Sequence, residues 1–293
     1  MLYSGNGQLV LASESKLVEF LNSVVFVLGA PDPEMGRVQE VLDAIGGSVS
    51  SVVVEAKIEF ATVNNVRVHA GNAYKADPVH TDKTVVWIEC RATEFECPFI
   101  SIDHHNDGDF GFGMNAENYW EGSTVGQLYR LLMVNGASPA VLDKLFGADR
   151  YLVAASDHCP AAAYKGQCPG VDAQELADYR AARNAEFLSM DVEEYIARLS
   201  ISMEKAVSLQ EMELEGEVYY VASKPIDYLN EVSLRLGIAV EYVMDGNARD
   251  PRTKVGLLGG SPSLTAAWMA AKEGILVGIY GSPARGYAGG YLV

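Results

Sequence analysis

Two adjacent histidines follow a short apolar run in the segment FISIDHHNDGD, Phe99 to Asp109. Alternate residues of a strand face opposite ways, so His104 and His105 must each find a polar partner. Three of the chain's five histidines come after two such runs, because His158 follows Asp157 in VAASDHCP. Imidazole and carboxylate groups together suit Mn²⁺ or a similar divalent ion, which could polarise a phosphoryl oxygen and lower the pKa of a bound water.

Acidic residues lie at the ends of two further apolar runs. Asp32 and Glu34 follow SVVFVLGA, and Glu89 lies at the end of TVVWIEC. A single acid in such a place is ordinarily a solvated turn residue, and a structural protein could carry the pair His104 and His105 by accident. In open α/β sheets, however, ligands bind at the carboxyl ends of the strands. Because four apolar runs end in this way, the sequence predicts a metal site at one sheet edge.

The elements that must position these residues are short apolar runs rich in β-branched side chains, typical of strands buried on both faces. Helical patterns separate several of them. Residues 35–47 carry apolar side chains at three- and four-residue spacing, and Ser123 or Thr124 opens a second such pattern as its N-cap. Strands that alternate with helices indicate a parallel sheet. The expected strands cover 23–30, 51–60, 84–90, 99–103 and 151–156.

The second half of the chain begins with long, charged, helix-favouring sequence. Two helices with Asp191 as the cap between them form a connector, and apolar runs then return. We therefore predict an α/β protein with a parallel-sheet domain at 1–172, a helical linker at 173–210 and a smaller α/β domain at 211–293. In the smaller domain we expect strands at 217–223, 237–244, 253–259 and 274–280, and helices at about 225–236 and 262–273.

Charge and composition restrict the partners. The chain of 293 residues has 39 acidic and 22 basic side chains, a net charge of −17. Such a charge repels long duplex nucleic acid but allows a small phosphorylated ligand held through metal ions. The sequence has no signal peptide and no apolar run that could cross a membrane, so we expect a soluble cytoplasmic protein. A homodimer is compatible with the sequence.

The four cysteines do not indicate a secreted disulfide scaffold in a chain of this length. A zinc site formed by all four is the alternative. Its spacings, C-x₆-C and C-x₈-C, match no usual zinc pattern. These residues are Cys90, Cys97, Cys159 and Cys168.

FISIDHHNDGD resembles the signature motif of the Asp-His-His (DHH) phosphoesterase superfamily, and its surroundings agree in order over roughly residues 22–160. VFVLGAPDPEMG resembles the first motif, VVWIEC the second, GSTVGQLYRLL the Ser-Thr helix that follows the signature, and LVAASDH the fourth motif. The C-terminal GIYGSPARGYAGGYLV is similar to the DHH-associated substrate domain. For this C-terminal segment, a Gly-rich turn followed by an edge strand is the alternative interpretation.

The resemblance implies a metal-dependent phosphoesterase that acts on small nucleotides or short oligonucleotides with Mn²⁺ or Mg²⁺. Asp103 would orient His104, and His105 would contact the phosphate or act as an acid. The implied metal ligands are Asp32, Glu34, Glu89, His104 and Asp157. The residues expected to hold substrate are Arg285, His158, Lys75 and Lys165.

Several positions depart from the family pattern. Leu28 stands near the place of the first-motif histidine, and Glu34 and Glu89 replace aspartates. The C-terminal Gly-Gly-Gly-His loop is replaced by residues 281–284, Gly-Ser-Pro-Ala. These departures favour the rival hypothesis, a catalytically degenerate relative that binds a nucleotide or a protein partner. His158 either compensates as a ligand or is a surface residue.

The segment at 67–83 is long for the gap between the first two motifs. It is either a substrate loop or a solvated excursion. Its candidate side chains are His69, Asn72, Tyr74, Lys75 and His80.

Overall fold

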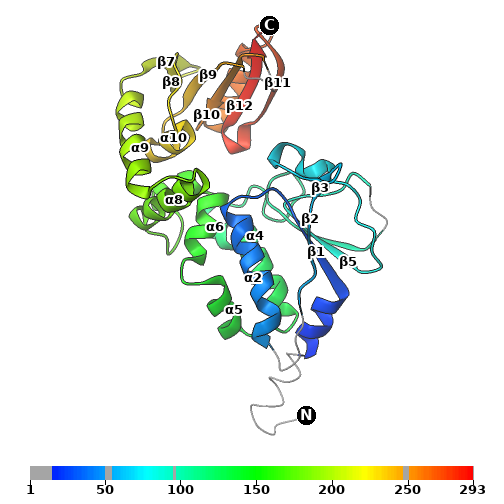
Figure 1. The fold of residues 1–293 in the computed structure, drawn as a ribbon. Coiled ribbons are helices and arrows are strands. Elements are labelled where there is room, and N and C mark those ends of the chain that lie inside the picture. The colour runs from blue at the N-terminus through cyan, green and yellow to red at the C-terminus, as the bar shows by residue number, and fades with distance from the viewer. Residues whose placement is uncertain (1–14, 50–54, 95–96, 247–250, 293) are drawn as a thin grey trace. The chain divides into compact units, whose positions relative to one another are not determined.

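The computed structural model describes residues 15–49, 55–94, 97–246 and 251–292. The chain divides into two compact units, Met1–Leu176 and Ala177–Val293 (Figure 1). The helix α8 (Ala173–Phe187) crosses this division, and α9 (Val192–Ala206) belongs to the second unit. The helices expected as a connector are therefore largely part of the second unit.

A parallel sheet forms the centre of the first unit. Its strands β1 (Val24–Leu28), β2 (Ile58–Phe60), β5 (Thr84–Ile88) and β6 (Phe99–Ile102) lie in the order β2-β1-β5-β6, and every neighbouring pair is parallel. All four carboxyl ends consequently meet at one edge. The chain leaves β1 for β2 on one side and later returns to β5 on the other, so the ends of β1 and β5 mark the point where ligands bind in such sheets.

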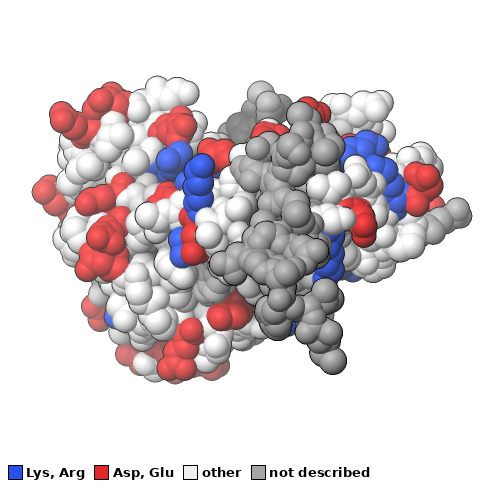
Figure 2. All heavy atoms as spheres, turned by 90° about the horizontal axis from the view of Figure 1, so that it is seen from below, with Lys and Arg blue, Asp and Glu red and all other residues white. Residues whose placement is uncertain are grey.

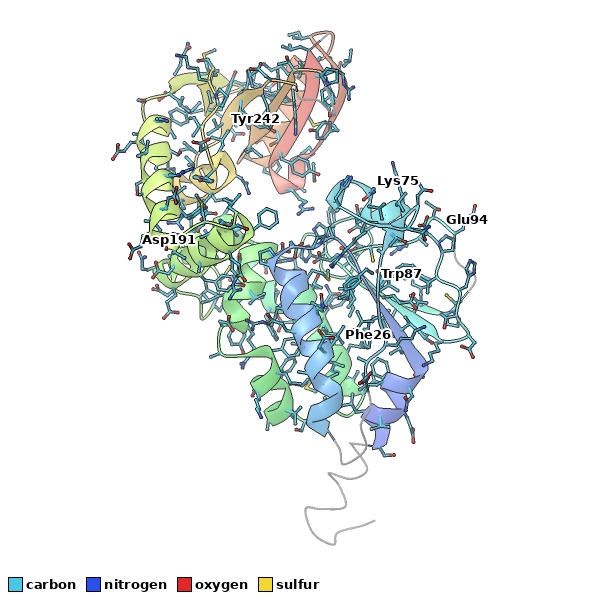
Figure 3. All side chains as sticks on the ribbon, in the orientation of Figure 1. Phe26, Lys75, Trp87, Glu94, Asp191 and Tyr242 are labelled. Atoms are coloured by element: carbon cyan, nitrogen blue, oxygen red, sulfur yellow. The ribbon has the colours of Figure 1, made fainter. Side chains whose placement is uncertain are left out.

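Helices cover one face of this sheet. The helices α2 (Pro33–Val49), α4 (Thr124–Val134), α5 (Pro139–Phe146) and α6 (Arg150–His158) contact one another, and α4 also contacts β6. Figure 1 shows them together on one side of the strands. Alternation along β1 places Phe26 on this side, and Figure 3 shows it between α2 and the sheet.

The opposite face packs against residues 61–76. The strands β3 (Thr62–Val63) and β4 (Val66–Arg67) form a hairpin, and the 3₁₀ helix η1 (Ala70–Lys75) follows. Val27 and Trp87 from the sheet form a buried cluster with residues of this cover, among them Val68, Ala73 and Ala76. A solvated excursion therefore does not describe the first half of the 67–83 segment, because its apolar residues complete a core.

One strand prediction in the first unit is wrong. Residues 151–156 belong to the helix α6, whose buried face consists of Val153, Ala154 and Ala155. A short apolar run without strict alternation fits a strand and one turn of a buried helix equally well, and alanine favours the helix. The strand expected at 51–60 is limited to β2, and its residues 51–54 lie outside the described residues.

The second unit contains a six-stranded mixed sheet in the order β11-β12-β10-β9-β8-β7. Only β8 and β9 are parallel, and α10 (Leu229–Leu236) connects them; all other pairs are antiparallel. The helix α11 (Pro262–Ala271) contributes the buried Leu264 and Trp268 to the core under this sheet. The strands are β7 (Gln210–Leu214), β8 (Glu217–Ala222), β9 (Val240–Met244), β10 (Lys254–Leu258), β11 (Leu276–Ser282) and β12 (Tyr287–Leu292).

The Gly-rich C-terminus forms an internal strand, since β12 lies between β10 and β11. The alternative interpretation of this segment as an edge strand is therefore wrong, and β7, which begins at the last residue of the predicted linker, is an additional strand. The cap at Asp191 is confirmed, because its side chain accepts the backbone N–H groups of Glu193 and Glu194 (Figure 3). The fold class is α/β, as predicted.

Acidic side chains are spread over the face seen in Figure 2, whereas Lys and Arg form a few small groups there. Among the described residues, no helix combines the length and the apolar composition needed to cross a membrane.

A glycine at the end of β1 allows this strand to approach β5 closely. A Cβ atom at Gly29 would lie 2.5 Å from the carbonyl oxygen of Glu89, whereas one at Gly36 would meet nothing within 4 Å. We expect Gly29→Ala to lower the free energy of unfolding by about 1–3 kcal/mol through overpacking. The matched change Gly36→Ala, on the exposed side of α2, should raise it by up to about 1 kcal/mol. Urea denaturation of the two variants measures both effects, and equal effects would contradict this account.

Candidate metal centre

The N-terminus of α4 anchors two of the predicted acids. The backbone N–H of Val125 donates to Glu34 Oε1 at 3.0 Å, and the Thr124 hydroxyl donates to Glu89 Oε1 at 2.6 Å. Ser123 caps the same turn through the N–H of Gly126. A helix N-terminus carries partial positive charge and unpaired N–H groups, so it stabilises anions. Of the Ser-Thr pair predicted as a helix start, Thr124 thus also holds Glu89, while the backbone N–H of Val125 beside it holds Glu34.

Glu89 reaches α4 through an unusual backbone conformation. It follows β5 with φ of 50°, in the left-handed region that non-glycine residues rarely adopt. Its N–H still donates to the carbonyl of Ile102 on the neighbouring strand. Such a conformation costs on the order of 1–3 kcal/mol and concentrates at functional sites.

His104 and Asp157 approach each other as two ligands of one ion would. Nε2 of His104 lies 2.9 Å from Oδ2 of Asp157, but the approach lacks the alignment of a hydrogen bond. Both ring nitrogens of His104 and Oε2 of Glu34 are buried and have no hydrogen-bond partner. Two donors about 2.2 Å from one ion and at right angles to each other are about 3.1 Å apart. Residues with orphaned, converging donors fit a metal ion.

Asp103 positions His105 rather than the His104 ring. Its Oδ1 lies 2.9 Å from Nδ1 of His105 and also accepts the backbone N–H groups of both histidines. Its Oδ2 accepts the hydroxyl of Tyr74, which comes from η1. The expectation that Asp103 orients the His104 ring is thus corrected. A histidine held through Nδ1 by a carboxylate has a fixed tautomer and presents Nε2 as its ligand or proton-transfer atom.

Four side chains can offer their donor atoms to one ion. Ligand atoms of Glu89, His104, His105 and Asp157 all lie within 4.8 Å of one another. Asp32 lies beside them at the start of α2, where Oδ1 accepts the backbone N–H of Met35. Carboxylates and imidazoles suit divalent ions that accept oxygen and nitrogen ligands.

Burial and mutual repulsion raise the pKa values of three of these acids. The pKa of Asp32 rises from its usual value to about 7, because of burial and the charges of Glu89 and Asp157. The same causes raise the pKa of Glu34, and burial with the charge of Asp157 raises that of Glu89. Burial alone would also raise the pKa of Asp157, but the His104 imidazole outweighs it and holds this pKa well below the usual range.

The structure does not bring every predicted residue to this centre. Lys75 and Lys165 are exposed, and no contact joins either to the clustered acids and histidines in the described part of the chain. Arg285 lies in the second unit, on the 3₁₀ helix Pro283–Arg285. The ring of His158 packs edge-on against the ring of His104, with 5.0 Å between the ring centroids. His158 is half-buried, so it is not the surface residue of the alternative interpretation. Leu28 is fully buried in β1, in agreement with its lack of a ligand function.

Two side chains near the centre were not predicted from the sequence. Arg67 contacts the carbonyl of Gly29 through its guanidinium, packs over the ring of Phe60, and lies close enough to Asp32 for their charges to interact. Gln127 on α4 donates to the carbonyls of Asp103 and Gly122 and so fixes the loop after β6. Only the position of Gln127, four residues after Ser123 on a predicted helix, offered a signal.

The cysteines do not form the alternative zinc site. In the part of the chain that the structure describes, the one group that could hold a metal contains no cysteine. Cys90 is buried and donates to the carbonyl of Val27, while the Sγ atoms of Cys159 and Cys168 lie 2.8 Å apart.

Neither the comparison with protein-family models nor the search of curated proteins finds a match to this chain. What can be said of its function therefore depends on the fold and on the chemistry of this centre.

Metal binding should stabilise the first unit. At a Mn²⁺ concentration of about 100 times its Kd, the free energy of unfolding should rise by about 2.7 kcal/mol. His104→Ala and Asp157→Ala each remove a donor and should abolish this gain, whereas His80→Ala, a change at an exposed histidine outside the cluster, should preserve it. Denaturation with Mn²⁺ and with EDTA measures the difference. An equal gain in all variants would show that Mn²⁺ binds elsewhere.

The metal-free protein should lose stability as pH rises. The folded state keeps a proton on Asp32 up to a pKa of about 7. The unfolded chain releases this proton near pH 3.9. The folded state thus binds more protons in between, and the free energy of unfolding falls with increasing pH. We expect denaturation in EDTA to show this fall between pH about 5 and 7, and Asp32→Asn to reduce it. Stability that increases over this range would contradict the assignment.

Proposed function

We propose that this protein is a metal-dependent phosphoesterase of the DHH type that hydrolyses phosphoester bonds of small nucleotides or short oligonucleotides. The observation that carries the proposal is the convergence of Glu89, His104, His105 and Asp157 within 4.8 Å at the carboxyl edge of a parallel sheet. The order of the motifs along the sequence, with the Asp-His-His segment between the second acid and the Ser-Thr helix, supports the choice of class.

Mn²⁺ is the ion we propose for this centre. Its preference for mixed carboxylate and imidazole ligands matches the donors, whereas Mg²⁺ favours oxygen donors and keeps its waters. A bound ion would supply Lewis-acid chemistry, polarising a phosphoryl oxygen and lowering the pKa of a water ligand. The residues that would hold it are His104, Asp157 and Glu89, with Asp32 and Glu34 beside them.

His105 has a separate task in this proposal. The pKa of Asp103 is held below its usual value because hydrogen bonds from His105 and Tyr74 outweigh the effect of burial, so this carboxylate remains charged. A charged Asp103 favours a proton on Nδ1 of His105 and stabilises the imidazolium. His105 would therefore donate a proton to the leaving oxygen of the ester through Nε2.

The charge of the chain favours a small substrate. With a net charge of −17 the protein repels extended polyanions, and acidic side chains are spread over the face in Figure 2. A mononucleotide, a dinucleotide or a short oligonucleotide carries few phosphates. Arg67, whose guanidinium lies near Asp32, is the cation of the first unit that we assign to the substrate phosphate.

Turnover tests the proposal. The purified protein with Mn²⁺ should hydrolyse at least one member of a panel of bis-(nitrophenyl) phosphate, linear and cyclic dinucleotides and short oligonucleotides. His104→Ala and Asp157→Ala should reduce product formation to background, and His80→Ala should leave it unchanged. His105→Ala should lower kcat about 10²-fold or more while Mn²⁺ affinity is retained. A loss of Mn²⁺ affinity in that variant would make His105 a ligand instead.

The rival hypothesis is a degenerate relative that binds without turnover. Leu28, buried where the family pattern has a histidine, is the observation that favours it. Stoichiometric Mn²⁺ binding by the intact protein, without hydrolysis of any member of the panel, would select this alternative. Absence of Mn²⁺ binding would reject both.

A further inference from the structure

Two cysteines form a close pair at the end of the helix that supplies Asp157. The Sγ atoms of Cys159 and Cys168 lie 2.8 Å apart. A disulfide requires about 2.05 Å, so the sulfurs need to approach by less than 1 Å. Cys159 is half-buried and Cys168 is 2% exposed. Cys159 is thus the more accessible of the two cysteines, although burial and the neighbouring Cys168 raise the pKa of its thiol and so slow its reaction with an oxidant.

The backbone holds both cysteines in place. Cys159 ends α6, where its N–H donates to Ala155, and its carbonyl accepts the N–H groups of Ala162 and Ala163 in α7 (Pro160–Tyr164). The carbonyl of Cys168 accepts the N–H of Val171 in the following turn. The fold thus holds the two cysteines side by side, and a disulfide between them could form without unfolding.

We propose that Cys159 and Cys168 are a peroxide-oxidised dithiol site, which closes a disulfide at the C-terminal end of α6. Hydrogen peroxide first transfers one oxygen to Cys159, giving a sulfenic acid and one water. The thiol of Cys168 then attacks this sulfur, so that the S–S bond forms, the S–O bond breaks and a second water leaves. Both sulfurs are oxidised, and the peroxide is reduced to two waters.

The disulfide would clamp the residues next to the metal centre. Asp157 lies two residues before Cys159, and His158 packs against His104. Because the sulfurs are already within 1 Å of bonding distance, the bond would fix α6 in its present position. Preorganisation of this kind should tighten Mn²⁺ binding roughly three- to tenfold. This last step rests on the proposed metal site; disulfide formation does not.

Trypsin provides a direct test of the bond, because Lys165 separates the two cysteines. Cleavage after Arg150, Lys165 and Arg180 gives the peptides 151–165 and 166–180, each with one cysteine. After treatment of the full-length protein with excess hydrogen peroxide and alkylation of the remaining thiols, these peptides should stay joined. They should separate on reduction. Recovery of both as singly alkylated peptides after peroxide treatment would overturn the proposal.

Matched variants and metal affinity complete the experiment. Cys159→Ser and Cys168→Ser should each abolish the joined peptide, and Cys97→Ser, a change outside the pair, should not. Mn²⁺ titration of the oxidised and the reduced protein then measures the coupling. Equal affinities with the bond present would refute the clamp. A protein that forms the bond but binds no Mn²⁺ in either state would refute the proposed function and leave the dithiol site intact.

Discussion

The main physical constraint on this structure is that carboxylates buried beside one another repel, and this repulsion must be compensated. Glu34 is 2% and Glu89 6% exposed, and both face the charge of Asp157. A low-dielectric interior tolerates such groups only when opposite charge or hydrogen-bond donors compensate them. Here the N-terminus of α4 supplies donors and partial positive charge, and His104 pairs with Asp157. The pKa values of Asp32, Glu34 and Glu89 are nevertheless raised, so part of the negative charge is not compensated. A bound cation would compensate it.

The strands and loops around this cluster hold the acids in defined positions. Parallel strands place the ends of β1, β5 and β6 at one edge, and Gly29 lets the first two approach without a Cβ between them. The left-handed backbone at Glu89 orients its carboxylate, and two hydrogen bonds between Gln127 and Asp103 fix the start of the loop after β6. Organisation before a ligand arrives is what a site with precise geometry requires.

The elements around the site could be read from the sequence where local chemistry determines them. Short β-branched runs gave β1, β5 and β6, and the Ser123 cap gave the start of α4. The helix α6 could not be recognised, because its apolar run lacks a period that separates helix from strand. The contact of Asp103 with His105 and Tyr74, the conformation of Glu89 and the internal position of β12 all follow from long-range packing. No local pattern encodes them, so the acids were found but not their partners.

The two glutamates that bind the N-terminus of α4 show that side-chain length, and not charge alone, defines this centre. Glu34 starts from α2 and Glu89 from the end of β5, yet both carboxylates end at neighbouring residues of one helix turn. Aspartate at either position would keep the charge but withdraw it by one carbon–carbon bond, about 1.5 Å. The helix would then lose its anions and the acids their donors. The length of each glutamate side chain therefore matches the distance to the start of α4, from α2 for Glu34 and from the end of β5 for Glu89.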